Sequence, residues 1–347
     1  MTATGAAIKL LTIAFRNLAA NGKTGTLRSL SLEMAIYRTD ARERLPPETG
    51  GSWKLIWACC RSTYQTVMQS LQLSELSLDK LDVFSSQRRC SLACNDVQLP
   101  EQYRLGPNRS LENIKTVCLS ISGRIIDETS RNLQITGDPD DDIDWSSKPE
   151  EFDMEVLRAL ATDDTNFTGV ASLLCGAANL ERLDLHWYRF LGHRIHVSDR
   201  QEHRLFARIS ETVALPKLQS CTLRGVYLTE ESLLALLHKS SLKQLRLEEA
   251  QMMAGTWRAV FDYCTTAASG MEYLHFDDLW EERLLYFDEP GEPKFPSLGG
   301  SHGTNTLIRA GVEARKPIAY HFTSDRPLGS PQAYVWREQR QREYGPP

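Results

Sequence analysis

The sequence predicts an α/β fold in which successive units each give one strand to a parallel sheet and one helix to a layer beside it. Two observations support this prediction: a recurring Leu-x-x-Leu-x-Leu pattern, and strand-like segments that alternate with helix-like segments in the second half of the chain. Leucine fills 46 of 347 positions, so composition alone accounts for about 0.8 strict matches. The chain holds four strict matches, which begin at Leu27, Leu73, Leu180 and Leu242.

Three looser copies of the pattern begin at Ile114, Leu218 and Met271. The pattern is the strand signature of a leucine-rich repeat, in which no single unit can bury its own apolar face and neighbouring units must stack. Successive copies start 46, 41, 66, 38, 24 and 29 residues apart, so the repeat is irregular. We therefore expect an irregular leucine-rich-repeat solenoid, with a parallel sheet on one face and helices on the other.

The clearest units lie between residues 218 and 276. The strand predicted at 218–224 is followed by Thr229, a favourable helix N-cap, and then by two glutamates that complement the helix dipole. The next strand is predicted at 242–247. Apolar residues at helical spacing follow over 257–264, and a further strand is predicted at 271–276. Strands and helices that alternate at this spacing require parallel strands with the helices on one side.

The N-terminal segment has two interpretations. Residues 6–20 predict a helix of the repeat series, Asn21-Gly22 its turn, and residues 27–32 the strand. Residues 1–32 also contain no acid, carry four basic residues and include an amphipathic stretch, a combination typical of a mitochondrial presequence. We favour the repeat helix, because a cleaved presequence would have no need of a strict repeat strand.

We expect one solenoid over residues 1–287 and a Gly/Pro-rich loop with a C-terminal tail element over residues 288–347. An acidic segment without apolar periodicity occupies about 136–150, so we expect an exposed insertion there. The tail combines a candidate strand at 318–322 with a short amphipathic helix near 332–342.

Composition excludes several classes of protein. The chain is 41% apolar and 24% charged, with a net charge of −5 and a pI near 6.0, which gives no reason to expect nucleic acid or an anionic membrane as partner. No apolar run approaches the ~18 residues that cross a bilayer. Eight scattered cysteines indicate reduced thiols and not a disulfide framework. We expect a cytoplasmic or nuclear protein, with the mitochondrion as the minor alternative.

No motif predicts a reaction, a metal or a cofactor. Gly22-Lys23-Thr24 lacks the earlier glycine and the following helix of a phosphate-binding loop. The aspartates of 138–144 lack the glycine and the bidentate glutamate of a calcium loop. Zinc would need further ligands beside the clustered histidines, ideally thiolates, and no thiolate lies near them in sequence. These histidines are His186, His193, His196 and His203.

The chain resembles the irregular leucine-rich-repeat proteins of filamentous fungi, many of which carry an F-box. The resemblance covers residues 170–347. Its most specific residues are Leu223–Leu234, Leu242–Leu247, Gly255-Thr256-Trp257, Arg326–Pro331, Trp336 and Glu343–Pro347. It implies a recognition scaffold, and in its specific form a substrate-recognition subunit of a ubiquitin ligase.

An F-box would bind a Skp-type adaptor, and no F-box is recognisable in this chain. Leu45-Pro46-Pro47-Glu48 echoes the Leu-Pro pair that opens an F-box, but it follows the first repeat and lacks the apolar helices that should come next. The adaptor is therefore expected as a partner only if an F-box lies upstream of Met1; otherwise the F-box was lost.

The expected function is non-enzymatic protein–protein recognition by the side of the sheet that faces away from the leucines. Alternate strand residues project there. In the second copy these are Glu75, Ser77 and Asp79, whereas the later strands add Arg, His and Tyr, types that are frequent in binding hot spots. The candidate partner-binding residues are Arg182, Asp184, His186, Arg224, Arg246, Glu248, Tyr273 and His275.

Two rival functions remain open. The first is a mitochondrial or other repeat protein unrelated to ubiquitin. The second is an enzyme, which would require a pocket with convergent polar groups.

Overall fold

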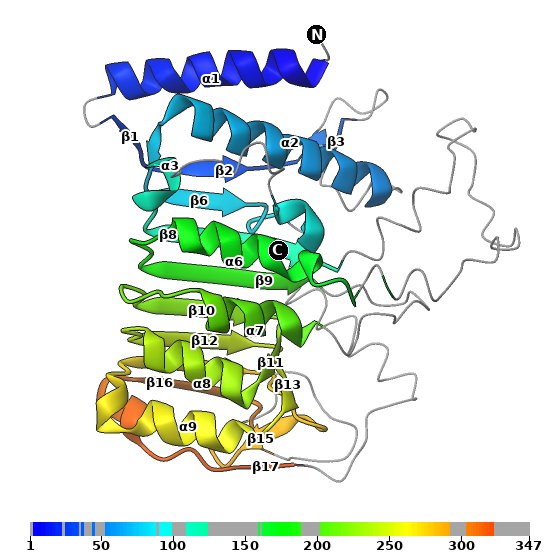
Figure 1. Ribbon diagram of the computed structural model, residues 1–347. Helices are drawn as coiled ribbons and strands as arrows, with labels where there is room; N and C mark the ends of the chain where they lie inside the picture. The colour runs from blue at the N-terminus through cyan, green and yellow to red at the C-terminus, as the bar shows by residue number, and fades with distance from the viewer. Residues whose placement is uncertain are drawn as a thin grey trace, which may run out of the picture.

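The structure, a computed structural model, is a mixed α/β arrangement in which a mostly parallel sheet lies beside a layer of helices (Figure 1). This arrangement of sheet and helices agrees with the sequence-based expectation. The residues that the structure describes are 3–22, 25–34, 36–37, 44–45, 53–87, 90–98, 109–123, 159, 162–188, 202–291 and 303–322.

Among the described residues, nine strands form the main sheet, and along its path they follow the order of the chain. All neighbouring pairs are parallel except the last, in which β16 runs antiparallel to β14. The strands are β2 (Leu30–Leu32), β6 (Lys80–Val83), β7 (Leu92–Ala93), β8 (Thr116–Ser122), β9 (Arg182–Tyr188), β10 (Ser220–Arg224), β12 (Gln244–Glu248), β14 (Tyr273–Asp277) and β16 (Thr306–Ala310).

In the part of the chain that the structure describes, four two-stranded sheets accompany the main sheet, two of them parallel and two antiparallel. The parallel pairs are β1 (Thr26–Leu27) with β5 (Ser77–Leu78) and β11 (Tyr227–Thr229) with β13 (Gln251–Ala254). The antiparallel pairs are β3 (Ile36–Tyr37) with β4 (Arg44–Leu45) and β15 (Leu285–Phe287) with β17 (Tyr320–Phe322).

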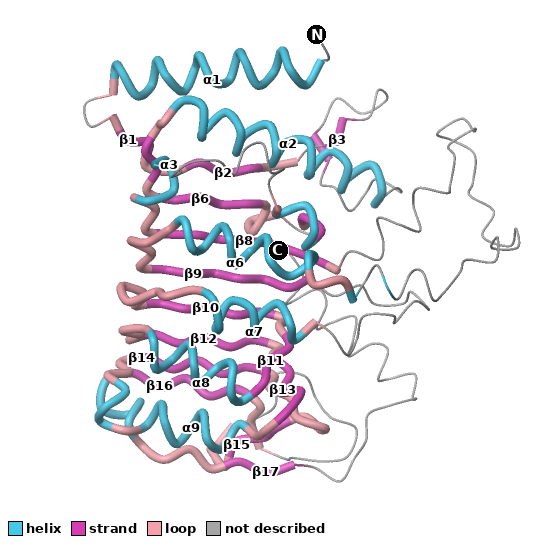
Figure 2. Tube along the Cα trace, in the orientation of Figure 1, coloured by secondary structure: helices cyan, strands magenta, loops and turns pink. Residues whose placement is uncertain are grey.

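The helices stack in chain order, and Figure 2 shows α6 to α9 in front of the strands. They are α1 (Ala3–Asn21), α2 (Trp53–Ser74), α3 (Arg109–Glu112), α6 (Thr165–Gly176), α7 (His203–Thr212), α8 (Glu230–Lys239) and α9 (Trp257–Thr265). Short 3-10 helices are η2 (Cys94–Val97), η4 (Ala267–Ser269) and η5 (Gly311–Arg315). No described helix is both long enough and apolar enough to cross a membrane.

The predicted helix start at Thr229 is confirmed. Its hydroxyl accepts a hydrogen bond from the Ser232 backbone N–H at 3.2 Å, and the Ser232 hydroxyl accepts one from the Thr229 N–H at 3.1 Å. This reciprocal capping box satisfies two backbone donors that the first turn of α8 would otherwise leave unpaired.

The core lies between the helices and the side of the sheet that carries the leucines. Leu183, Leu245 and Leu274 are fully buried, and in the sheet Leu245 is paired directly with Leu274. In the adjoining layer, Phe261 of α9 stacks on Phe276 of β14 with ring centroids 5.0 Å apart. The inward orientation predicted for these leucines is therefore confirmed.

The predicted register of the second copy is wrong. Leu73 lies in the last turn of α2 and is 46% exposed, and the strand of the main sheet comes later, at β6. Pairing aligns Leu78 with Leu27, Leu81 with Leu30 and Val83 with Leu32. The second copy is therefore Leu78/Leu81/Val83, because valine fills the third buried place as well as leucine does.

This correction also changes which residues face outward in the second copy. Ser77 and Asp79 lie before the strand of the main sheet, at its amino-terminal edge, and Glu75 ends the turn after α2. Lys80 and Asp82 occupy the outward positions instead, in register with Thr116 and Cys118 of β8.

A residue in the left-handed region directly follows four of the strands. These residues are Phe84 (φ 58°), Gly225 (φ 68°), Glu249 (φ 49°) and Asp278 (φ 57°). Gly225, Glu249 and Asp278 turn the chain out of the main sheet at the same level, and Phe84 does so one residue earlier. Because three of the four are not glycine, this shared turn could not be predicted from the positions of the glycines.

Both ends of the described chain belong to the main packing. Helix α1 packs on α2 and buries Phe15, as expected for a helix of the series. At the other end, β16 extends the main sheet and Leu307 joins the core. The acidic segment 136–150 and the expected helix at 332–342 lie outside the described residues.

Candidate functional site

The pairing register arranges the eight candidate residues in three rows across four neighbouring strands. We call this side of β6 to β16, opposite the leucine core, the outer face. The first row is Arg182, Ser220, Gln244 and Tyr273; the second is Asp184, Thr222, Arg246 and His275; the third is His186, Arg224, Glu248 and Asp277. The sequence-predicted residues therefore lie together on one surface.

Glu248 is the electrostatic centre of the outer face. Its Oε2 forms an ion pair with Arg224 Nε at 2.7 Å, and its Oε1 forms another with Arg246. The Glu248 side chain is only 4% exposed, whereas Arg224 is 20% and Arg246 45% exposed. Each guanidinium thus takes a separate oxygen of one buried carboxylate, which fixes both arginines at defined positions.

Asp184 lies in a different environment. Burial raises the pKa of this carboxyl above its ordinary range, Glu248 and Asp82 raise it further, and Arg224 and Arg246 oppose the shift. The Asp184 side chain makes no hydrogen bond or ion pair with any described residue. Ionised Asp184 is therefore an unfavourable charge on the outer face, unlike Glu248.

The two candidate histidines lie apart and are mostly buried. His186 is 2% exposed, and its Nδ1 lies 3.4 Å from the Ser120 hydroxyl. His275 is 8% exposed and lies three strands away on β14. Among the described residues, no group of three or more His, Cys, Asp or Glu side chains could hold a metal ion. His193 and His196 lie outside the described residues.

The structure adds residues to both ends of the outer face that the sequence reasoning missed. At one end, Lys80 and Asp82 of β6 form an ion pair at 3.3 Å. At the other, β16 places Ile308, which is 59% exposed, beside His275. The base–apolar–acid order around Leu81 was a usable signal for the first pair, whereas Ile308 lies on an antiparallel strand without the repeat pattern.

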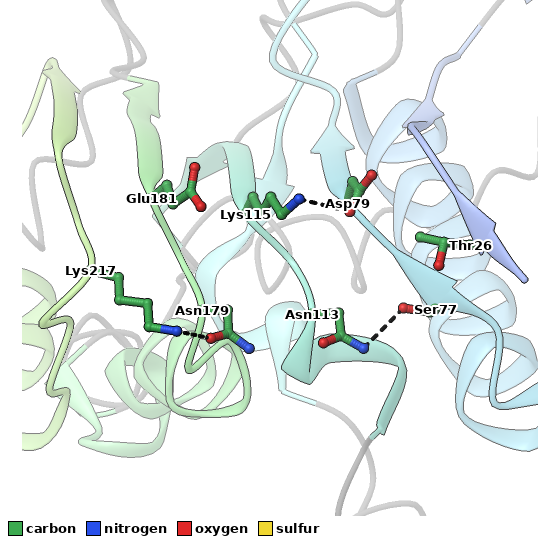
Figure 3. Close-up of a pocket in the computed structure, with 8 residues that line it drawn as sticks. All are labelled: Thr26, Ser77, Asp79, Asn113, Lys115, Asn179, Glu181 and Lys217. Carbon is green, nitrogen blue, oxygen red and sulfur yellow. Dashed lines mark hydrogen bonds and ion pairs between the residues drawn. The ribbon is translucent and has the colours of Figure 1, made fainter. Parts of the chain in front are cut away.

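A separate polar groove of about 410 Å³ lies along the edge where the strands begin (Figure 3). Its lining side chains come from successive copies of the apolar pattern, at the positions just before and just after the first apolar residue. They are Thr26, Ser77, Asp79, Asn113, Lys115, Asn179, Glu181 and Lys217.

Most of the polar groups in this groove join neighbouring copies to each other. Lys115 Nζ lies 3.7 Å from Asp79 Oδ1, Asn113 donates to the Ser77 hydroxyl at 3.1 Å, and Lys217 donates to Asn179. Figure 3 shows these side chains as pairs across the strands. The groove is thus lined by contacts that hold successive copies together.

A backbone ladder runs along the same edge. The Asp79 carbonyl accepts the N–H groups of Lys115 and Thr116, and the Lys115 carbonyl accepts those of Glu181 and Arg182. The same arrangement continues at Glu181, Gln219 and Lys243. We therefore assign this edge to the joints between copies, and take the outer face as the candidate site.

The chain matches no family model, no curated protein and no solved structure.

Proposed function

We propose that this protein is an irregular leucine-rich-repeat solenoid that binds another protein through its outer face. Three regularities support the repeat architecture: strands in chain order, apolar residues in register from strand to strand, and, from the second copy to the sixth, one carbonyl that accepts two N–H groups of the next copy. Solenoid surfaces of this kind commonly bind proteins.

The observation that favours binding by the outer face is the arrangement of its arginines. The Arg182 side chain is exposed and has no hydrogen bond or ion pair with any described residue, and the Arg246 side chain is 45% exposed. The guanidinium presents several donors in a rigid plane, and arginine is enriched among the residues that dominate binding energies. Two such groups on a rigid sheet offer a partner fixed anchoring points.

The experiment compares Arg182→Ala/Arg246→Ala with the matched control Arg61→Ala/Arg208→Ala. The control arginines lie on helices α2 and α7, with side chains 43% and 38% exposed. Each double variant removes one cation from a buried carboxylate, Glu248 in the outer-face pair and Asp96 in the helix pair, so the two are matched in this respect. Arg224 is left intact so that Glu248 keeps its second cation.

Proteins captured from cell extract by the wild type are identified by quantitative mass spectrometry. Recovery should fall at least tenfold with the outer-face pair and stay unchanged with the helix pair, with equal melting curves for both variants. Unchanged recovery by Arg182→Ala/Arg246→Ala would refute binding by the outer face.

The specific form of this proposal is a substrate-recognition subunit of a ubiquitin ligase, which the resemblance to F-box-associated repeat proteins suggests. Co-purification of a Skp-type adaptor with the full-length protein tests it. We place the protein in the cytoplasm or nucleus, and the packing of α1 on α2 supports a retained N-terminal helix in preference to a cleaved presequence. N-terminal sequencing of the cellular protein tests that placement.

A further inference from the structure

We infer that the outer face recognises an acidic segment of its partner, with carboxylates spaced to meet cations on every second strand and an apolar side chain beyond them. This inference rests on the proposed function, since it names the partner chemistry for the same surface. Three observations support it: basic side chains are more exposed than acidic ones on the outer face, two of the acidic side chains are already paired within the chain, and the exposed basic side chains are regularly spaced.

On the outer face, the basic side chains are more exposed to solvent than the acidic ones. Three strands carry a base followed two residues later by an acid: Lys80 and Asp82 on β6, Arg182 and Asp184 on β9, Arg246 and Glu248 on β12. The Lys80 side chain is 41% exposed against 7% for Asp82, and Arg246 is 45% exposed against 4% for Glu248. A partner that approaches this surface therefore meets the longer basic side chains before it meets the carboxylates.

Two of the acids are also occupied from within the chain. Asp82 accepts hydrogen bonds from the Ser85 N–H at 3.1 Å and the Ser85 hydroxyl at 2.6 Å, in addition to its ion pair with Lys80. Glu248 accepts from Arg224 and Arg246. The guanidinium donors of Arg182 have no such partner among the described residues. The unused hydrogen-bonding capacity of the exposed layer is therefore that of donors, which carboxylates complement in charge and geometry.

The exposed anchors recur at every second strand of the sheet. The basic anchors lie on alternate strands: Lys80 on β6, Arg182 on β9 and Arg246 on β12, with β8 and β10 between them. The exposed apolar residue Ile308 lies on β16, two strands beyond β12. Neighbouring strands lie about 4.8 Å apart, so successive anchors are separated by about 10 Å in the direction across the strands. A polyproline II helix has three residues per turn and rises about 3.1 Å per residue, so every third side chain points the same way. A segment in this conformation would therefore meet one anchor with every third residue.

Lys80 and Arg182 lie in the first row, whereas Arg246 and Ile308 lie in the second. The line of anchors thus crosses the strands obliquely, by one outward position. The matching segment has three acidic residues at intervals of three, followed after a further three by a large apolar residue.

The test measures binding of labelled peptides to the full chain by fluorescence anisotropy at physiological salt. The probe peptide has glutamates at its first, fourth and seventh positions, leucine at its tenth, and serine or glycine between them. One control peptide has the same composition with the three glutamates adjacent, and a second has lysine in place of each glutamate. A single-stranded oligonucleotide of equal charge tests whether any polyanion suffices.

The spaced acidic peptide should bind at least tenfold more tightly than each control and than the oligonucleotide. Arg182→Glu should weaken its binding at least tenfold, because Arg182 has no described partner whose loss would disturb the fold. A peptide with lysine in place of the central glutamate should restore binding to that variant. Arg208→Glu on α7, with a side chain 38% exposed, should leave binding unchanged.

Equal or tighter binding of the basic peptide or the oligonucleotide would overturn the inference, and so would equal binding by the wild type and Arg182→Glu. If no peptide binds, the acidic-segment inference fails. The capture experiment with Arg182→Ala/Arg246→Ala then decides separately whether the outer face binds proteins at all.

Discussion

The corrected register of the second copy leads to a direct test, because two leucines only eight positions apart have opposite environments. Leu81 is fully buried on β6, paired with Leu30 on one side and Val117 on the other. Leu73 lies in the last turn of α2 and is 46% exposed. The strict leucine pattern predicts a buried Leu73 and leaves Leu81 out of the strand, whereas the structure exposes Leu73 and buries Leu81 on β6.

Replacing Leu81 by alanine removes three buried carbons, which costs about 2.4 kcal/mol at roughly 0.8 kcal/mol per carbon. The cavity left in a packed sheet adds to this, so we expect Leu81→Ala to lower the free energy of unfolding by about 3–5 kcal/mol. Leu73→Ala removes carbons that are nearly half in water already, a loss of about 1 kcal/mol. Alanine's better helix propensity offsets a few tenths of a kcal/mol of that loss.

Urea titration followed by far-ultraviolet circular dichroism compares the two variants with the wild type in the same buffer. Arrays of repeated units need not unfold in a single step, so the midpoint of the first transition is the quantity to compare. Equal midpoint shifts for Leu73→Ala and Leu81→Ala, or a larger shift for Leu73→Ala, would show that the register argued from the structure is wrong.

Two further predictions concern backbone strain and pH. Gly225→Ala should destabilise the protein by at least 1 kcal/mol more than Gly270→Ala in thermal melts. Both residues have φ 68°, so the backbone strain of an alanine is the same at the two positions. The new Cβ at Gly225, however, would lie 2.3 Å from the Trp187 carbonyl oxygen, while nothing lies within 4 Å of a Cβ at Gly270. Equal losses would contradict this contact. Burial raises the pKa of Asp184 above its ordinary 3.8, so the folded protein favours the protonated carboxyl. The stability that this protonation provides is fully present below pH 3.8 and is lost as the pH rises through the raised pKa of the folded state. Asp184→Asn should therefore unfold at higher urea than the wild type at pH 7, with a gain that shrinks as the pH falls, and a loss of stability at pH 7 would disprove this account.

The core could be predicted from the sequence because inward positions obey one local requirement. Each must be apolar and recur at the spacing of the strand, and in the second half of the chain leucine satisfies this at nearly every place. The helix of α9 follows the same logic, since Trp257, Val260, Phe261 and Cys264 are all fully buried as expected. The predicted register of the second copy is wrong because the buried position requires an apolar residue and not leucine itself. A pattern of leucines alone does not include Val83.

The composition of the outer face could also be predicted, but the state of its residues could not. Strand alternation places Arg224 and Glu248 on one side of the sheet, which any correct register reveals. Their ion pair, however, joins residues 24 positions apart, and it exists because β10 and β12 are aligned with these two opposite each other. The depth of Glu248 and the exposure of Arg246 depend on such neighbours across strands, which a single sequence does not encode locally.

One register error also hid the feature that gives the outer face its chemistry. Lys80-Leu81-Asp82, Arg182-Leu183-Asp184 and Arg246-Leu247-Glu248 share a base–leucine–acid order, and this order is visible in the sequence once the strand is placed correctly. With Leu73 as the start of the second copy, the outward residues become Glu75, Ser77 and Asp79, and the early part of the face is acidic. With Leu78 as the start, Lys80 stands in the same row as Arg182, separated from it only by Thr116. The two registers therefore predict opposite charges for this end of the outer face, acidic from Leu73 and basic from Leu78. The pairing of β6 with β2 and β8 shows that the exposed residue there is the basic Lys80.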